Sequence, residues 1–257
     1  MINFNKFYKL FNIISLILVI ASILLLFFKG LNFGVDFKGG TLIELRTNDK
    51  QVNITTLRDS FNNMNLGDVN IKKFGNDDDY LIKIEKKDTT NNLIETIKKD
   101  LSLSIGDTFN FRRVENVGPK VSSELLKSGI IAIALSLAAM LFYIWIRFEW
   151  QFSLGAILAL FHDVIITLGL FSLFNLEINL SIVAAVLTIV GYSMNDTVVI
   201  FDRVRENLRK FSDIKINELT NTSINETLSR TIITSVTTLL ALVSIYLFGG
   251  EILKGFS

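Results

Sequence analysis

Two reactive side chains are nearly absent from the sequence. Its 257 residues include no cysteine and a single histidine, His162. Without cysteine, the chain cannot form disulfides, iron–sulfur clusters or thiolate zinc sites. One histidine argues against histidine-based metal sites and against a Ser-His-Asp catalytic triad. Phosphate-loop and HExxH motifs are also lacking. We therefore expect a protein that is not an enzyme and that holds no metal or organic cofactor.

An excess of charge of either sign is also absent. Lys and Arg number 26 and Asp and Glu number 25, which gives a formal net charge of +1. This balance gives no reason to expect nucleic acid as a partner. Hydrophobic residues, in contrast, make up 50% of the chain, and soluble domains seldom carry so many without somewhere to bury them. We expect an integral membrane protein in contact with the lipid bilayer.

Five long apolar runs follow one another along the chain. They comprise residues 11–28, 130–146, 152–174, 178–201 and 231–248. Each is close to the ~20 residues that cross the hydrocarbon core of a bilayer as a helix. The first run follows Lys6 and Lys9, as the apolar part of a signal peptide would. It is long and has no small-residue cleavage site, so we expect an uncleaved anchor.

The distribution of Lys and Arg predicts the orientation of these spans. The segment between the fourth and fifth runs is rich in both types, whereas the turn at residues 174–178 has neither; the basic residues of that segment are Arg203, Arg205, Arg209, Lys210, Lys215 and Arg230. Because short basic loops stay in the cytoplasm, we place the N-terminus and a loop at about residues 202–229 there. In the cell inner membrane, residues 1–31 then form the first span and residues 130–257 the remaining bundle. Residues 32–129 form a domain in the periplasm.

The periplasmic segment alternates between strand and helix patterns. The predicted elements, in order, are a strand at 41–46, a helix at 54–64, strands at 69–74 and 79–85, a helix at 89–101 and a strand at 107–117. A "GNDD" turn joins the middle strands, and Thr89 or Thr90 caps the second helix. The order β-α-β-β-α-β predicts an α+β ferredoxin-like domain.

The glycines in "GVDFKGGT", Gly39 and Gly40, precede the first of these strands. Dinucleotide and phosphate loops place a helix directly after their glycines, and no helix follows here. We interpret Gly39 and Gly40 as a tight turn that leads into the strand.

A carboxylate in the fourth run, Asp196, is the most unusual feature of the spans. At about 1.5 Å per residue it lies roughly 10 Å from the middle of its run, next to the amide of Asn195. Arg230 lies roughly 14 Å from the middle of the fifth run on the same side, so the two charges match in depth to about one turn. They can form a pair that protonation of Asp196 would release. Alternatively, Asp196 is an interfacial acid and Arg230 extends toward lipid phosphates.

Further polar residues lie in the third and fifth runs. His162 and Asp163 are near the centre of the third. They can form a step in a proton relay or a polar contact that fixes helix packing. The two point about a quarter-turn apart, so they cannot both face one partner directly. The Thr- and Ser-rich face of the fifth run, residues 234–238, can line a wet path or allow close helix packing.

Four segments carry a resemblance to a known family. "FGVDFKGGT", "RFEWQFSLGAILALFHDVIITLG", "GYSMNDTVVIFDRVRENLRK" and "LSRTIITSVTTLLALVSIYLFGGEILKGFS" together resemble the SecD/SecF family, of the resistance-nodulation-division superfamily, and its SecF subunits in particular. The family's proton-linked aspartate falls on Asp196 and its essential arginine on Arg230. The family also has a sixth span after "GGEILKGFS", so we expect this chain to be an incomplete form of such a subunit.

The resemblance implies a function in protein export. Its partners would be SecD, the SecYEG channel and the translocating unfolded polypeptide, with YajC and YidC as further partners. Protons would be the coupling ion, and no cofactor is implied. Two alternatives were weighed. A small-molecule efflux pump of the same superfamily needs far larger outer domains, whereas a scaffold that only binds SecD and the channel is compatible with the sequence.

Overall fold

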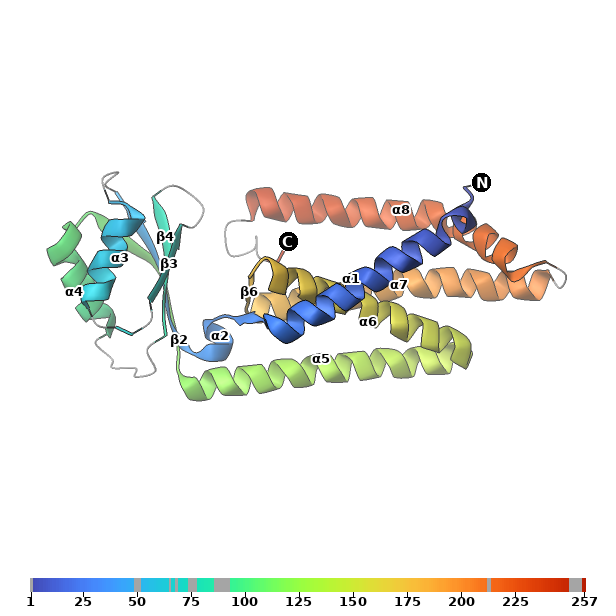
Figure 1. The fold of residues 1–257 in the computed structure, drawn as a ribbon, viewed down its shortest axis with the longest axis horizontal. Coiled ribbons are helices and arrows are strands. Elements are labelled where there is room, and N and C mark those ends of the chain that lie inside the picture. Colours follow the sequence, from blue (N-terminus) through green and yellow to red (C-terminus); the bar gives the residue numbers. More distant parts are fainter. Residues whose placement is uncertain are drawn as a thin grey trace. The chain divides into compact units, whose positions relative to one another are not determined.

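The protein is described here by a computed structural model. The structure describes residues 2–48, 52–64, 66–67, 69–73, 78–85, 93–211, 214–249 and 256–257. The chain forms two compact units: residues 33–131, here called the small unit, and residues 1–32 with 132–257, here called the helical unit. Figure 1 shows both, and each is described by itself.

The small unit is built on a four-stranded antiparallel sheet. Its elements are β2 (Gly40–Thr47), α3 (Ile54–Asn63), β3 (Val69–Lys73), β4 (Asp79–Ile84), α4 (Leu93–Ile105) and β5 (Phe109–Val117). The strands lie side by side in the order β3-β4-β2-β5. Both helices cover the same face of the sheet (Figure 1). The chain order of strands and helices is the one that the sequence predicts.

Apolar side chains between the sheet and its helices form a closed core. The strands contribute residues such as Ile43 and Ile82, and the helices contribute Leu57, Phe61 and Ile97, all with no exposed surface. Alternate residues of a strand point to opposite faces, so only one face of each strand enters this core. Burial of these side chains, at about 25 cal/mol per Å² of apolar area, stabilises the unit.

The helix boundaries of the small unit follow partly from local signals. Asn53 caps α3, because its side-chain oxygen accepts a hydrogen bond from Thr56 N at 3.0 Å. The second helix, predicted at residues 89–101, continues to Ile105. The predicted caps Thr89 and Thr90, and all but the last residue of the predicted turn at 75–78, lie outside the described residues.

The two glycines before β2 have the backbone that the tight-turn interpretation requires. Gly39 and Gly40 have φ angles of +78° and +126°. A Cβ atom on Gly40 would lie 2.5 Å from Ile84 O, so the approach of β4 requires glycine there. The sequence did not predict the single helical turn before them, α2 (Val35–Lys38), nor the short strand β1 (Asn32–Phe33).

Arg46 and Arg112 surround Asp79 on the sheet of the small unit, where Asp79 is only 3% exposed. Arg46 donates two hydrogen bonds to the Asp79 carboxylate, Nε to Oδ1 and Nη2 to Oδ2, each at 2.6 Å. Arg112 Nη1 lies 3.5 Å from Asp79 Oδ2. The hydrogen bonds to Asp79 raise the pKa of Arg46 above its usual value. The cation of this pair therefore stays charged at any physiological pH.

The membrane-capable helices lie in the helical unit, except that residues 119–131 of one of them belong to the small unit. Five helices among the described residues are long and apolar enough to cross a membrane: α1 (Tyr8–Phe28), α5 (Pro119–Arg147), α6 (Trp150–Leu173), α7 (Leu180–Lys210) and α8 (Ile216–Phe248). A 3-10 turn, η1 (Phe4–Lys6), precedes α1, and a short strand, β6 (Glu177–Ile178), precedes α7. α6 packs against α1 and α7, and α7 packs against α8. The protein is thus a multi-pass membrane protein.

Residues 202–229, the predicted cytoplasmic loop, are largely the ends of α7 and α8, and their location in the cytoplasm stays a prediction. α7 continues to Lys210 and α8 begins at Ile216, so most of this segment is helical. The polar sequence suggested a loop, but packing between the two extensions stabilises them as helices. Val204 and Leu219 are 8% and 2% exposed. The side chains of Asn207 and Ser223 also form a hydrogen bond of 3.0 Å between the extensions.

Small and polar residues let α1 approach α6 closely. A Cβ atom on Gly169 of α6 would lie 2.8 Å from the Cα atom of Ser22 in α1. Ser172 Oγ donates to Gly30 O at 2.7 Å. Such small-residue contacts are the usual means by which helices associate in lipid. At the other end of α1, Phe4 N donates to the side chain of Asn221 in α8 at 2.8 Å.

Candidate functional site

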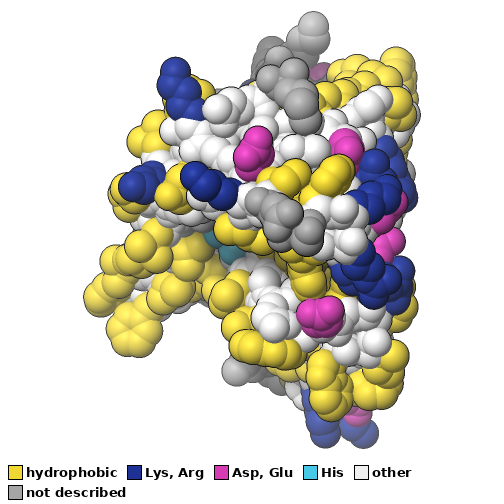
Figure 2. Space-filling view, turned by 90° about the vertical axis from the view of Figure 1, so that its right-hand side faces the viewer, with side chains coloured by type: hydrophobic (Ala, Val, Ile, Leu, Met, Phe, Trp, Pro, Cys, Tyr) yellow, Lys and Arg dark blue, Asp and Glu magenta, His cyan; other side chains and the backbone are white. Residues whose placement is uncertain are grey.

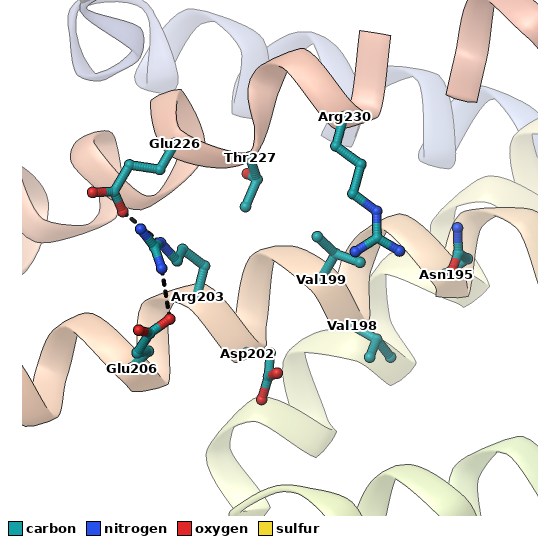
Figure 3. Close-up of a pocket in the computed structure, with 9 residues that line it drawn as sticks. All are labelled: Asn195, Val198, Val199, Asp202, Arg203, Glu206, Glu226, Thr227 and Arg230. Carbon is teal, nitrogen blue, oxygen red and sulfur yellow. Dashed lines mark hydrogen bonds and ion pairs between the residues drawn. The ribbon is translucent and has the colours of Figure 1, made fainter. Parts of the chain in front are cut away.

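Two cavities in the helical unit are lined by polar residues. The first, the α7–α8 cavity, has a volume of about 610 Å³ and is drawn in Figure 3; it is lined by Asn195, Val198, Val199, Asp202, Arg203, Glu206, Glu226, Thr227 and Arg230. The second, the three-helix cavity, has a volume of about 550 Å³ between α6, α7 and α8; its polar lining residues are His162, Asp163, Thr167, Thr188, Tyr192, Ser193, Ser235 and Thr238. Of the charged, histidine and amide residues predicted within the spans, Asn195, Arg230, His162 and Asp163 line these cavities and Asp196 does not.

A network of charged side chains lies at one end of the α7–α8 cavity and links the two helices. Arg203 donates from Nε to Glu226 Oε2 at 2.7 Å and from Nη1 to Glu206 Oε2 at 2.6 Å. Lys210 Nζ donates to Glu206 Oε1 at 2.6 Å. Asn207 is 2% exposed, and its Nδ2 donates to Glu226 Oε2 at 2.7 Å. The network therefore joins the extension of α7 to that of α8.

The Arg230 side chain lies at the other end of the same cavity. Figure 3 shows it extending from α8 toward α7, where it approaches Val199 and Asn195 and points away from Glu226. Within the described part of the chain, its guanidinium makes no hydrogen bond and no ion pair. It is thus a charged group directed at the turn of α7 that precedes Asp196.

The structure does not join Asp196 to Arg230. Asp196 is half-buried, and its carboxylate forms no ion pair with any described residue. Asn195 lines the cavity beside Arg230, whereas Asp196, which points about 100° from it around the helix, is not among the lining residues. The pairing predicted from their matched depths is therefore absent from this conformation, although both charges lie at neighbouring turns of α7 and α8.

The three-helix cavity contains the polar groups predicted for the third span. Asp163 Oδ1 lies 2.8 Å from His162 Nδ1, and Ser193 of α7 donates its hydroxyl hydrogen to Asp163 Oδ2. The adjacent side chains of His162 and Asp163 thus bond to each other, which the sequence reasoning missed. His162 Nε2 is buried, and no described residue forms a hydrogen bond with it. The contact between Asp163 and Ser193 joins α6 to α7.

The Thr- and Ser-rich face of α8 divides between two roles. Ser235 and Thr238 line the three-helix cavity, and Tyr192 donates from its hydroxyl to Ser235 Oγ at 3.4 Å. Thr234 and Thr237 instead donate to carbonyl oxygens one turn earlier in their own helix. Only part of the face is therefore directed at the neighbouring helix.

Sequence reasoning missed the residues of the charged network. Arg203 and Asn207 are four residues apart, as are Glu226 and Arg230, and residues with this spacing share one helix face. The signal was present in the sequence. It was overlooked because residues 202–229 were interpreted as a loop, in which spacing by four has no meaning.

The end of the helical unit where α7 gives way to α8 is also rich in cations. Arg147 and Arg205 both donate to Asp202 Oδ1, at 3.1 and 3.0 Å. Both guanidinium groups also lie over the ring of Phe148, at 5.1 and 5.4 Å from its centroid. Figure 2 looks onto this end and shows Lys and Arg side chains interspersed with Asp and Glu.

These observations define a class of protein. Ionisable residues inside a bundle of membrane-spanning helices are costly, and they commonly mark the ion or substrate path of a transport protein. Here a guanidinium, a carboxylate and a His-Asp pair occur between apolar helices, in a chain that also carries an α+β unit. The fold and the site are those of a multi-pass membrane transport protein.

Comparisons with known proteins identify the family. The model of the C-terminal part of the protein export membrane proteins SecD and SecF matches residues 97–257, and that of the SecD/SecF GG motif matches residues 24–50. Protein translocase subunit SecF of Rickettsia bellii is 45% identical over 257 residues, which cover 99% of this chain and 84% of that protein. The subunit of Calditerrivibrio nitroreducens is 46% identical over 256 residues, 97% of this chain and 83% of that protein. The chain belongs to the SecF family of protein translocase subunits.

A solved structure supports the same assignment. The crystal structure of SecDF, a translocon-associated membrane protein from a Thermus species, superimposes with a TM-score of 0.89 at 34% identity. The match covers 99% of this chain and 35% of that chain. This chain therefore spans about a third of the length of the solved protein. The GG motif includes Gly39 and Gly40, for which the fold supplied a physical reason.

Proposed function

We propose that this protein is an accessory subunit of a bacterial protein translocase that couples proton movement to polypeptide export. Its partners are a SecD-type subunit, the SecYEG channel and the unfolded polypeptide in transit, with YajC and YidC as further partners. Relatives across its full length are named protein translocase subunit SecF, which supports the export function. No bound cofactor is proposed, because protons are the coupling ion.

One observation carries the proposal of proton coupling. The unpaired guanidinium of Arg230 extends from α8 to the turn of α7 that holds Asn195 and Asp196. A half-buried carboxylate near an unpaired cation has two states. The ionised carboxylate is attracted to the cation, and the protonated one is not. A proton that binds Asp196 changes the attraction between α7 and α8. Movement of these helices would then be transmitted to the rest of the protein.

Asn195, Asp163 and His162 support this switch. Asn195 lines the α7–α8 cavity beside Arg230 and offers an amide oxygen to the guanidinium. Asp163 and His162 line the three-helix cavity, where the bond from Ser193 to Asp163 joins α7 to α6. A role for the His162 and Asp163 pair as a relay step remains a prediction.

The same proposal includes a topology. The N-terminus lies in the cytoplasm and residues 32–129 lie in the periplasm, in a cell inner membrane protein. The basic groups around Phe148 and along the end of α7 support a cytoplasmic location for that end. The small unit is of the ferredoxin-like type, which its strand order β3-β4-β2-β5 and its pair of helices support.

Replacement of Asp196 by Asn tests the coupling. The amide keeps the size of the side chain but cannot ionise, so proton-gradient stimulation of export into inverted membrane vesicles should fall by about tenfold or more. Copurification with the SecD-type partner should be unchanged. Asp59→Asn, at an exposed carboxylate of α3, serves as the matched control. Undiminished stimulation by the Asp196→Asn protein would refute the scheme.

A scaffold role is the second candidate. The hydrogen bond between Ser193 and Asp163 and the ion pairs of Arg203 join helices in the way that purely structural contacts do. A scaffold binds its partners without moving protons. Proton flux in vesicles that hold this subunit and its SecD-type partner, with and without Asp196→Asn, distinguishes the two: only a coupled transporter loses flux.

A further inference from the structure

The ion pair that the sequence of α8 favours most is not formed. Glu226 precedes Arg230 by four residues, and Glu followed by a cation at this spacing is the favourable orientation for an ion pair on one helix. Figure 3 shows the two side chains pointing in opposite directions, with Thr227 between them. Other contacts must therefore hold the Glu226 carboxylate away from Arg230.

Two donors from α7 occupy the Glu226 carboxylate. Arg203 Nε and Asn207 Nδ2 both donate to its Oε2 atom, each at 2.7 Å. A carboxylate that accepts two such bonds, one of them from a cation, is held more strongly than by a single surface pair. Both donors come from the neighbouring helix, so they turn Glu226 toward α7 and away from the next turn of α8.

The donors themselves are fixed in place. Asn207 is 2% exposed, and its Nδ2 also donates to Ser223 Oγ at 3.0 Å, so both amide hydrogens are used. Arg203 donates to Glu206, which also accepts from Lys210. A run of alternating charges thus leads from Lys210 to Glu226.

We propose that Arg203 and Asn207 are positioning residues for Arg230: by holding Glu226, they prevent it from capturing the Arg230 guanidinium. Arg230 then stays directed at Asn195 and the turn of Asp196. The inference rests on the proposed coupling role of Arg230 only for its effect on transport. The structural claim, that Glu226 pairs with Arg203 and not with Arg230, does not depend on that role.

Substitution of Arg203 by Gln tests the proposal in the full chain with its SecD-type partner. Loss of the cation should let Glu226 turn to Arg230, and proton flux into vesicles should fall about threefold or more. The second change Glu226→Gln should restore the flux, because an uncharged amide holds a guanidinium much less strongly than a carboxylate does. Rescue is also expected if Arg203 only neutralises Glu226, so the position of Arg230 is measured separately. Arg209→Gln removes an exposed arginine of the same helix and should leave the flux unchanged.

A thiol probe measures the position of Arg230 without reference to transport. The chain has no cysteine, so Val199→Cys introduces a single thiol at the residue that Arg230 approaches in Figure 3. A nearby guanidinium lowers the pKa of a thiol and speeds its alkylation by iodoacetamide. The rate should fall about threefold in Arg203→Gln and recover with Glu226→Gln. Asn207→Leu, which removes the second donor while Ser223 keeps its bond to Leu219 O, should act in the same direction.

The two readouts separate the inference from the proposed function. A change in alkylation rate without a change in flux supports the positioning role and argues against a role for Arg230 in coupling. An unchanged alkylation rate in both Arg203→Gln and Asn207→Leu overturns the inference, whatever the flux. A loss of flux that Glu226→Gln does not restore also overturns it.

Discussion

The small unit and the helical unit both bury apolar side chains, but the helical unit also exposes many of them. In the small unit, Phe61 and Ile82 have no exposed surface, whereas the Arg46 side chain is 35% exposed. In the helical unit, Phe248 is 86% exposed, whereas Asn207 is 2% exposed. Water drives the apolar groups of the first inward, and lipid removes that drive from the second. The surrounding solvent, rather than the side-chain type, decides what each interior contains.

The largest expected difference comes from the same substitution made in each unit. Phe61→Ala leaves a cavity in the closed core and should destabilise the small unit by about 3–5 kcal/mol. Phe248→Ala shortens a side chain that is 86% exposed, and should change the stability by less than about 0.5 kcal/mol. Pulse proteolysis of the full protein in detergent, with cleavage followed in each unit, measures both. Equal losses would contradict the contrast between the interiors.

A second prediction concerns the closest helix contact of the helical unit. Gly169→Ala places a methyl group against Ser22, within 2.4 Å of its Cβ atom, and should cost about 1–3 kcal/mol through overpacking. Ser22→Gly should recover part of that loss in the double variant, because it removes the Ser22 side chain but leaves its Cα atom 2.8 Å from the new methyl group. Resistance to unfolding in detergent is the measurement. Gly155→Ala is the matched control, since it meets only the end of the Phe201 ring, at 3.3 Å.

Much of the fold could be predicted because its signals are local. The alternation in residues 41–46 and the lengths of the apolar runs each depend on a few consecutive residues. The ends of α7 and α8 could not be placed in this way. Arg203 and Glu226 favour helix there only through contacts with the other helix, and a single sequence does not display such contacts.

The candidate site also has one property that the sequence predicts, the depth of its residues, and one that it does not, the direction in which they point. The depth of Asp196 and Arg230 follows from counting residues, so the sequence predicts both as site residues. Which way each side chain faces depends on the rotation of each helix about its axis, and that is set by packing against its neighbours. Counting therefore placed Arg230 near the turn of Asp196 but did not show that Asn195, rather than Asp196, lines its cavity.

A third, smaller effect is expected for the polar contact between α6 and α7. Asp163→Leu removes the acceptor of the Ser193 hydroxyl, and side-chain hydrogen bonds between membrane helices average about 0.6 kcal/mol. Ser193→Ala removes the same bond from the other side. A double-mutant cycle on unfolding in detergent should give a coupling energy near that value. Independent, fully additive losses would mean that the contact does not stabilise the bundle.

The smallest expected effect belongs to the Arg46 and Asp79 pair of the small unit. Its hydrogen bonds raise the pKa of Arg46, so the stability that the cation contributes is fully present below its unfolded pKa and is lost only as the pH rises through the still higher folded value. Both values lie far above neutrality. Between about pH 6 and about pH 9, the unfolding midpoint of the small unit should therefore not change through this arginine. Proteolysis across that range in the parent and in Arg46→Gln measures it: the two should differ by a constant amount, and a difference that varied with pH would show that the cation is not held as the structure indicates.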